Sequence, residues 1–277
     1  MRPRTRTTVR VGAVSLVGLA AMVMSGLTTV SSAAAGSGIV EVHAPRVPGP
    51  TPPARPGALG TVQGWSSKNW SGYALSGAGF TQVTGSWHVP QVQAPTGKRH
   101  YRRSTFSSSW VGIDGFGNRN LIQAGTEQDW LNGRAFYRAW WEILPASETP
   151  IDSVRISPGD AITVSISFGT PDWTITVTDV TTGKSFTTLQ AYAGPLTSAE
   201  WIQEAPTIGR RVATLAPDAP VSFDAGTVNG ANPGLTSSDA GAMFKGRHQI
   251  STPSAPDSDT DGFAVAYGNI APAAPPS

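Results

Sequence analysis

Two segments far apart in the sequence each carry a polar side chain of a type used in catalysis, inside a run with the composition of a β-strand. They are SSSWVGIDGFGNRNLIQAGTEQDW (107–130), which contains Gln123, and AEWIQEAP (199–206), which contains Glu204. A carboxylate can take a proton from water and later return it to a leaving group. A primary amide can hold water through its oxygen while its NH2 group donates to an oxyanion. These residue types are therefore suited to hydrolysis by activated water.

Turn signals predict how the strands beside Gln123 pair. Asn-Gly at 132–133 is the strongest two-residue hairpin signal, and Gly-Asn at 117–118 is a second one. If both close two-residue loops, Leu131 faces Arg134 and Phe116 faces Arg119, which fixes the register of three adjacent strands. The opposed residues are then Gln123 between Gly112 and Glu142, Gly125 between Trp110 and Trp140, and Glu127 opposite Arg138, an ion pair that supports the register.

Alternation along these strands separates a core face from a groove face. The groove face receives Trp110, Gly112, Asp114, Gln123, Gly125, Trp140 and Glu142. The core face receives Val111, Ile113, Ile122, Ala124, Trp141 and Ile143. In the second segment Glu200, Ile202 and Glu204 share one face, whereas Trp201 and Gln203 take the other.

With NWSGY (69–73) and YRAWWEILP (137–145), these segments resemble the glutamic peptidases, the eqolisin family of acid endopeptidases, over most of the chain after residue 68. In that family a Gln and a Glu do the chemistry, and the matching positions are Gln123 and Glu204. Glu204 matches through the pattern Ala-Glu-aromatic-Ile-x-Glu, but Ala205 follows it where family members often carry Asp, and Glu200 remains a competitor for its role.

The resemblance implies an acid endopeptidase that acts on polypeptides, resists pepstatin and needs no metal or organic cofactor. Glu204 is then general base and later general acid, and Gln123 orients water and donates to the oxyanion. Four residues would bind substrate around this dyad, with Asp114 the weakest of them: Trp110, Asp114, Trp140 and Glu142.

Two other functions stay open. Nine tryptophans suit an aromatic groove for polysaccharides, and a retaining glycosidase could use Glu142 and Glu204, since such enzymes need two carboxylates about 5–5.5 Å apart. A noncatalytic carbohydrate-binding module would need the indoles alone. Hydrolysis of a soluble β-glucan, as against acid-denatured protein, distinguishes these functions.

The chain divides into three parts. Residues 1–35 have the Arg-rich start, short apolar run and small residues of a cleaved signal peptide. Residues 36–67 are rich in proline and are either a linker or, as the resemblance suggests, a propeptide. Residues 68–277 contain many short β-rich runs between turns, such as ITVSISF (162–168) and WTITVTDV (173–180), which predict an all-β, two-sheet antiparallel β-sandwich. Its expected type is concanavalin A-like or jelly-roll.

Charge and cysteine content limit the partners. Removal of the leader removes four arginines and changes the formal net charge from +2 to −2, so the high pI belongs mostly to the leader and no basic patch for nucleic acid remains. Without cysteine the exported protein has neither disulfides nor a thiolate nucleophile. We expect a secreted, extracellular monomer with no membrane contact after signal cleavage.

One acidic motif lies outside the resemblance. Asp257-Ser258-Asp259-Thr260-Asp261-Gly262 matches the start of a calcium loop, but Gly268 stands where a bidentate Glu should be. An acidic, solvated turn is the alternative interpretation.

Overall fold

The computed structural model describes residues 41–43, 49–50, 64–96 and 104–277. The chain divides into two units, Met1–Ala35 and Gly36–Ser277. The first unit, which contains the expected signal peptide, lies outside the described residues, all of which belong to the second.

The described residues form strands and turns without a helix, and therefore include no helix that could cross a membrane. The strands are β1 (Glu41–Val42), β2 (Gly49–Pro50), β3 (Gly64–Ser67), β4 (Trp70–Ser76), β5 (Gln82–His88), β6 (Ser108–Ile113), β7 (Ile122–Leu131), β8 (Arg134–Ile143), β9 (Thr149–Pro150), β10 (Ala161–Phe168), β11 (Trp173–Asp179), β12 (Lys184–Gln190), β13 (Ser198–Glu204), β14 (Thr207–Ile208), β15 (Arg211–Val212), β16 (Val221–Phe223), β17 (Thr227–Val228), β18 (Ala240–Lys245), β19 (His248–Pro253) and β20 (Phe263–Tyr267).

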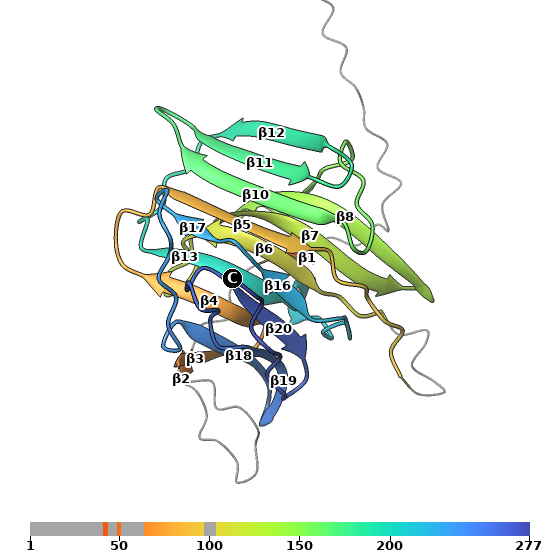
Figure 1. Ribbon diagram of the computed structural model, residues 1–277. Coiled ribbons are helices and arrows are strands. Elements are labelled where there is room, and N and C mark those ends of the chain that lie inside the picture. The colour runs from red at the N-terminus through yellow and green to blue at the C-terminus, as the bar shows by residue number, and fades with distance from the viewer. Residues whose placement is uncertain (1–40, 44–48, 51–63, 97–103) are drawn as a thin grey trace, which may run out of the picture. The chain divides into compact units, whose positions relative to one another are not determined.

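The strands make two packed layers (Figure 1). The first layer has the order β9-β8-β7-β6-β13-β4-β18-β3-β2, antiparallel except for the parallel pair β18–β3. The second layer has the order β12-β11-β10-β5, and β5 continues to β16, β20 and β19. The β18–β19 hairpin joins the layers. This architecture confirms the expected antiparallel β-sandwich.

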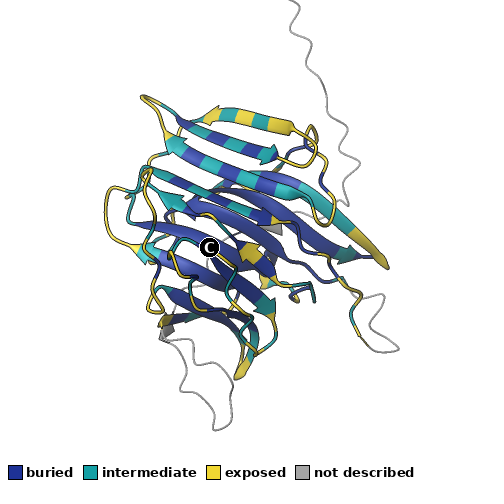
Figure 2. Ribbon diagram, viewed as in Figure 1, coloured by how far each residue is buried: buried dark blue, intermediate teal, exposed yellow. Residues whose placement is uncertain are grey.

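Burial distinguishes the strands that carry the site. In β10 and β11 buried residues alternate with more exposed ones, which is visible as banding in Figure 2. In β6 and β13 every residue is buried. A strand with both faces covered loses the alternation, so the second face of these strands is enclosed as well. The core between the layers includes Val111, Ile113, Ile122, Ala124, Trp201 and, partly buried, Trp141 and Ile143.

The predicted register of β6, β7 and β8 is confirmed. Gln123 pairs with Gly112 and with Glu142, Gly125 with Trp110 and Trp140, and Glu127 with Arg138. Asn132 and Gly133 both have positive φ (51° and 82°), as a two-residue hairpin turn requires.

The predicted two-residue loop at 117–118 is wrong, although it gave the right register. β6 ends at Ile113 and β7 begins at Ile122, so the connection covers residues 114–121. Asp114 and Gly115 adopt φ of 69° and 105°, which turns the backbone out of the extended conformation directly after Ile113. The pairing Ile113↔Ile122 belongs to the same register, because a longer loop of matching parity leaves the opposed residues unchanged.

The sheet starts before residue 68. β3 pairs with β18, Trp65 of β3 is buried, and its indole Nε1 donates to the backbone oxygen of Asp239 at 2.7 Å. Residues 64–67 are thus built into the sandwich and are not a loose connection to it.

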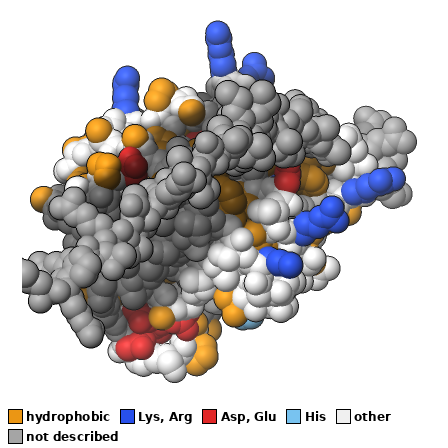
Figure 3. Space-filling model, turned by 90° about the horizontal axis from the view of Figure 1, so that it is seen from above, with side chains coloured by type: hydrophobic (Ala, Val, Ile, Leu, Met, Phe, Trp, Pro, Cys, Tyr) orange, Lys and Arg blue, Asp and Glu red, His pale blue; other side chains and the backbone are white. Residues whose placement is uncertain are grey.

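Charge is unevenly distributed on the face drawn in Figure 3. Acidic side chains gather at one edge, whereas Lys and Arg side chains project from several separate positions.

Candidate active site

The second, enclosed face of the first layer brings the predicted groove residues together. Trp110, Trp140 and Ile202 pack there in one cluster with Trp65, Trp70 and Leu121. Gly125 lies between the two indole-bearing strands, and a Cβ at this position would lie 2.2 Å from the oxygen of Ser109 and 2.5 Å from Cβ of Trp110. The glycine therefore allows the close approach of β6 to β7 beneath the indoles.

Glu204 is fully buried on this face and is held by two donors. Asn69 Nδ2 donates to Glu204 Oε1 at 2.8 Å, and Trp110 Nε1 donates to Glu204 Oε2 at 2.8 Å. β13 lies between β4 and β6, which supply these partners: Asn69 directly precedes β4 and Trp110 belongs to β6. Two donors fix the orientation of the carboxylate and favour its ionised form.

Gln123 is also fully buried, and its amide nitrogen is oriented by Glu142. Gln123 Nε2 donates to Glu142 Oε2 at 2.6 Å, and Oε1 of Gln123 has no hydrogen-bond partner among the described residues. Because Glu142 and Gln123 are directly opposed on β8 and β7, the register alone brings these two groups into contact. The amide thus keeps an acceptor oxygen available.

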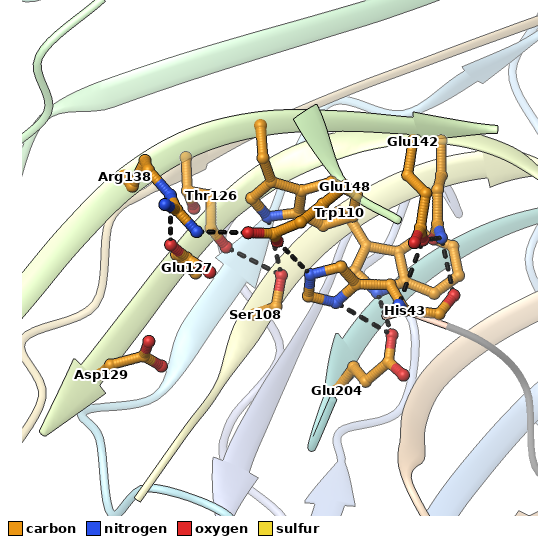
Figure 4. A network of polar contacts seen from close by, with 12 residues as sticks. His43, Ser108, Trp110, Thr126, Glu127, Asp129, Arg138, Glu142, Glu148 and Glu204 are labelled. Atoms are coloured by element: carbon orange, nitrogen blue, oxygen red, sulfur yellow. Dashed lines mark hydrogen bonds and ion pairs between the residues drawn. The ribbon is translucent and has the colours of Figure 1, made fainter. Parts of the chain in front are cut away.

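His43, which precedes the sandwich in the sequence, lies in this site (Figure 4). Its carbonyl oxygen accepts from Gln123 Nε2 at 2.6 Å, and its backbone N–H donates to Glu142 Oε2 at 3.1 Å. Its ring stacks on Trp140, with centroids 3.8 Å apart and planes at 5°. The imidazole lies between two carboxylates, with Nδ1 3.5 Å from Glu204 Oε2 and Nε2 2.9 Å from Glu148 Oε2.

The segment that carries His43 is held as an added strand. β1 pairs antiparallel with β14, with Glu41 opposite Ile208 and Val42 opposite Thr207. β14 follows Glu204 closely in the sequence. Pairing with β14 therefore brings β1, and His43 directly after it, close to Glu204. Backbone hydrogen bonding of this kind places a peptide with little dependence on its side chains.

Burial and charge pairing set the ionisation of the site. Burial raises the pKa of Glu142 to about 7 and also raises the pKa of Glu204, while His43 and the other donors act in the opposite direction. Burial disfavours a charged His43, but its hydrogen bonds to Glu148 and Glu204 outweigh this and hold its pKa well above the ordinary value. The raised pKa favours the protonated form of His43 beside these carboxylates.

Comparison with known proteins gives these residues a family. The sequence profile of the peptidase A4 family matches residues 68–263, which is most of the chain. The chain belongs to the peptidase A4 family. The resemblance to the glutamic peptidases, or eqolisins, is thereby confirmed.

Two curated relatives and one solved structure support the peptidase A4 assignment. The chain is 31% identical to aspergillopepsin-2 of Aspergillus niger over 59% of this chain and 65% of that protein. It is 32% identical to scytalidopepsin B of Scytalidium lignicola over 49% of this chain and 51% of that protein. The chain thus spans about half to two thirds of these relatives. A crystal structure of scytalido-glutamic peptidase with a transition state analog inhibitor shares the fold, with a TM-score of 0.59 at 22% identity over 72% of this chain and 98% of that chain.

In this peptidase A4 chain, two residues that the sequence suggested for the active site do not contact Gln123, His43 or Glu204. They are Asp114 and Glu200. Asp114 anchors loops: its carboxylate accepts from the hydroxyl of Tyr192 at 2.7 Å and from the backbone N–H groups of Leu196 and Thr197. Glu200 lies in the cross-strand row of Gln123, but Gly112 on β6 separates the two residues. Burial raises the pKa of Glu200 well above its ordinary value.

Three residues of the site escape sequence reasoning. Glu148 lies at the end of the loop after β8 and contacts both His43 and Arg138, and Arg138 also pairs with Glu127 at 2.5 Å. Asn69 belongs to the NWSGY motif, which could have suggested it. His43 and Glu148 have no comparable signal, because only the folded chain brings them to the dyad.

Proposed function

We propose that the chain is a secreted acid endopeptidase in which Glu204 and Gln123 activate water against a peptide bond. The proposal rests on the position of one backbone carbonyl group of the chain itself. The carbonyl oxygen of His43 accepts a hydrogen bond from Gln123 Nε2 at 2.6 Å, and the ring of the same residue lies beside Glu204. A site that holds a peptide carbonyl on an amide N–H is suited to the carbonyl of a peptide substrate. Membership of the peptidase A4 family supports the same reaction.

In the proposed reaction Glu204 accepts a proton from water as the water oxygen bonds to the carbonyl carbon. The carbonyl oxygen becomes an oxyanion and accepts a hydrogen bond from Gln123 Nε2, while Gln123 Oε1 orients the water. The C–N bond then breaks, and Glu204 gives its proton to the leaving amine, so that the carboxylate is restored and the products are an acid and an amine. Glu142 keeps the amide of Gln123 turned toward the substrate.

Trp110 and Trp140 are the proposed substrate-binding residues in this scheme. Trp140 supplies a flat surface, since the imidazole of His43 stacks on it at 3.8 Å. Trp110 holds Glu204 through its indole N–H. Asp114 is proposed to act indirectly, through the loop that it anchors.

We further propose that the segment from residue 36 to about residue 63 is a propeptide whose His43 occupies the site before processing. A cut in this scheme falls before Gly64, because β3 belongs to the sandwich. Sequencing the N-terminus of the exported protein, before and after incubation in acid, tests this. We expect the N-terminus to lie near residue 36 before incubation and close to residue 64 after it. An N-terminus that does not change in acid would contradict the proposal.

The activity is tested with two substrates offered in parallel, acid-denatured protein and soluble β-glucan. We expect cleavage of the protein at acid pH with and without pepstatin, and no release of sugar. Hydrolysis of the glucan that requires Glu142 and Glu204 would instead support the glycosidase, and binding without hydrolysis the carbohydrate-binding module.

A further inference from the structure

Three aspartates from separate parts of the chain converge where β16 ends and β20 begins. Asp224 directly follows β16, and Asp257 and Asp261 belong to the loop between β19 and β20. β16 and β20 pair antiparallel, with Phe223 opposite Phe263, which brings the two segments side by side. One carboxylate oxygen from each aspartate lies within 4.8 Å of the others.

Asp257 directs an unsatisfied oxygen into this cluster. The residue is 7% exposed, and its Oδ2 has no hydrogen-bond partner among the described residues. Its other oxygen, Oδ1, accepts from the backbone N–H of Asp261 at 3.2 Å. No Lys, Arg or His in the described parts of the chain forms an ion pair with any of the three carboxylates. A buried, ionised carboxylate oxygen without a donor or counter-charge is unfavourable, and a bound cation is one way to compensate it, beside protonation or a water molecule.

Gly262 lets the carboxylate of Asp257 approach the backbone closely at this point. A Cβ at position 262 would lie 2.2 Å from Asp257 Oδ2, 3.1 Å from Asp224 Oδ1 and 3.1 Å from the carbonyl oxygen of Phe223. The absence of a side chain therefore lets two carboxylate oxygens and one carbonyl oxygen gather beside position 262. Oxygen donors of these two kinds are the ligands that hard divalent cations take.

We propose that Asp224, Asp257 and Asp261 bind a calcium ion that ties the end of β16 to the loop before β20. Calcium takes 6–8 oxygen ligands at about 2.3–2.6 Å, so oxygens up to 4.8 Å apart can share one ion, with the remaining positions open to water. Three carboxylates without nitrogen or sulfur ligands favour calcium over zinc or copper.

Electrostatics agree with a cation here. Burial and the neighbouring carboxylates raise the pKa of both Asp224 and Asp261, with Asp259 among the contributing charges. A bound divalent ion would reverse this mutual repulsion, because binding favours the ionised carboxylates.

The geometry differs from the loop that the sequence suggested. Asp257 and Asp261 keep their places as ligands, but Asp259 is not one of the three converging carboxylates. The missing Glu at position 268 is replaced by a carboxylate from another segment, Asp224. The proposed site is thus made by strand pairing and does not need a twelve-residue loop.

The test uses the full chain at about pH 7, freed of metal by a chelator and then titrated with calcium or magnesium chloride. We expect calorimetry to give one calcium per chain and the unfolding midpoint to rise by roughly 5–10 °C at about 100 times the Kd. Magnesium at the same concentration should give a smaller rise, since it requires a tighter octahedral site.

Variants decide which residues are responsible. Asp261→Asn and Asp257→Asn should each lose most of the calcium-dependent rise in the unfolding midpoint. Asp257 is buried, so its replacement could also impair folding; Asp261 is partly exposed, and its variant tests the site without that risk. Asp172→Asn removes one charge from a half-buried bend directly before β11 and should keep the full rise. No calcium binding at millimolar concentration, an equal response to magnesium, or an unaltered rise in a folded Asp261→Asn variant would overturn the proposal.

Discussion

Glu204 and Gln123 both contact His43, but with different hydrogen-bonding groups. Glu204 holds only acceptors and is oriented by Asn69 and Trp110. Gln123 presents a donor to the His43 carbonyl, and its acceptor oxygen has no hydrogen-bond partner in the part of the chain that the structure describes. The proposed reaction requires both functions, and exchanging either group should affect a separate step.

Replacing Glu204 with Gln keeps the shape of the side chain and removes the proton acceptor. We expect turnover of denatured protein to fall by about 10²–10⁴, because general acid–base catalysis contributes an effect of that size. Near-ultraviolet circular dichroism should show an unchanged fold. Full activity in a folded variant would exclude the proposed mechanism.

Gln123→Glu adds a third carboxylate to those of Glu142 and Glu204. Like charges raise the pKa of one of them, and the oxyanion donor is lost unless the new acid is protonated. We expect a loss of about 10²-fold or more, with the remaining activity displaced to lower pH. Activity profiles against pH measure both effects, and a profile of unchanged position would contradict the assigned role.

Glu142→Gln distinguishes the peptidase from the glycosidase. With its pKa raised to about 7 by burial, Glu142 is neutral in acid and ionises only as the pH rises through that value. A neutral amide should therefore keep activity within about tenfold in acid, since it can still accept from Gln123. The variant should also retain more of its activity toward neutral pH, where ionised Glu142 would repel Glu204. A loss as large as that of Glu204→Gln would point to a catalytic carboxylate pair.

At the scale of elements, the site depends on how closely β6, β7 and β8 approach one another. Gly125 permits this approach, because a side chain there would meet the backbone of Ser109 and Cβ of Trp110. The two indoles that border the site are positioned by this pairing.

Gly125→Ala should therefore disturb both stability and catalysis. We expect a loss of about 1–3 kcal/mol in the free energy of unfolding, since overpacking forces the neighbouring backbone to move. Urea denaturation measures it. Gly133→Ala is the control for glycine replacement, because its Cβ would meet open space, although its φ of 82° adds local strain. A Gly125→Ala variant with unchanged stability and activity would show that the close approach is not needed.

At the scale of the whole molecule, a segment from outside the sandwich lies in its site. The attraction between His43 and the carboxylates of Glu148 and Glu204 requires a protonated imidazole and ionised partners. The raised pKa of His43 means that the imidazole carries its full charge below about pH 6.5 and loses it only as the pH rises through the raised value, so the contribution from His43 protonation is lost on the alkaline side. The raised pKa of Glu204 means that acid neutralises this partner early. The attraction is therefore strongest near neutral pH and weakens in acid.

His43→Ala should release the site in the unprocessed chain. We expect faster cleavage of a peptide substrate than by the unprocessed wild type at about pH 6, because the imidazole no longer lies beside Glu204. His88→Ala, on an exposed histidine of β5, is the matched control. Equal rates for the two variants at every pH, measured before any processing, would contradict an inhibitory role for His43.

Local pattern was sufficient for much of the protein. Alternation of apolar residues and the Asn132-Gly133 turn determined the β7–β8 register and the division into core and groove faces, whereas the β6–β7 register was predicted correctly from a turn at 117–118 that the structure does not contain. These features depend on residues close in sequence or related by one hairpin, whose geometry is set by the backbone alone. Motifs of the peptidase A4 family indicated Gln123 and Glu204.

Contacts between distant segments were decided only by the tertiary structure. No local rule relates His43 or Glu148 to Glu204, or Asp224 to Asp257, because these pairs form through strand pairing and layer packing over long separations. Position 114 shows the same limit: strand parity assigned Asp114 to the groove, but a positive φ directs the chain into a loop that its carboxylate anchors. Periodicity ends where a strand ends, and beyond that point only packing determines where a side chain lies.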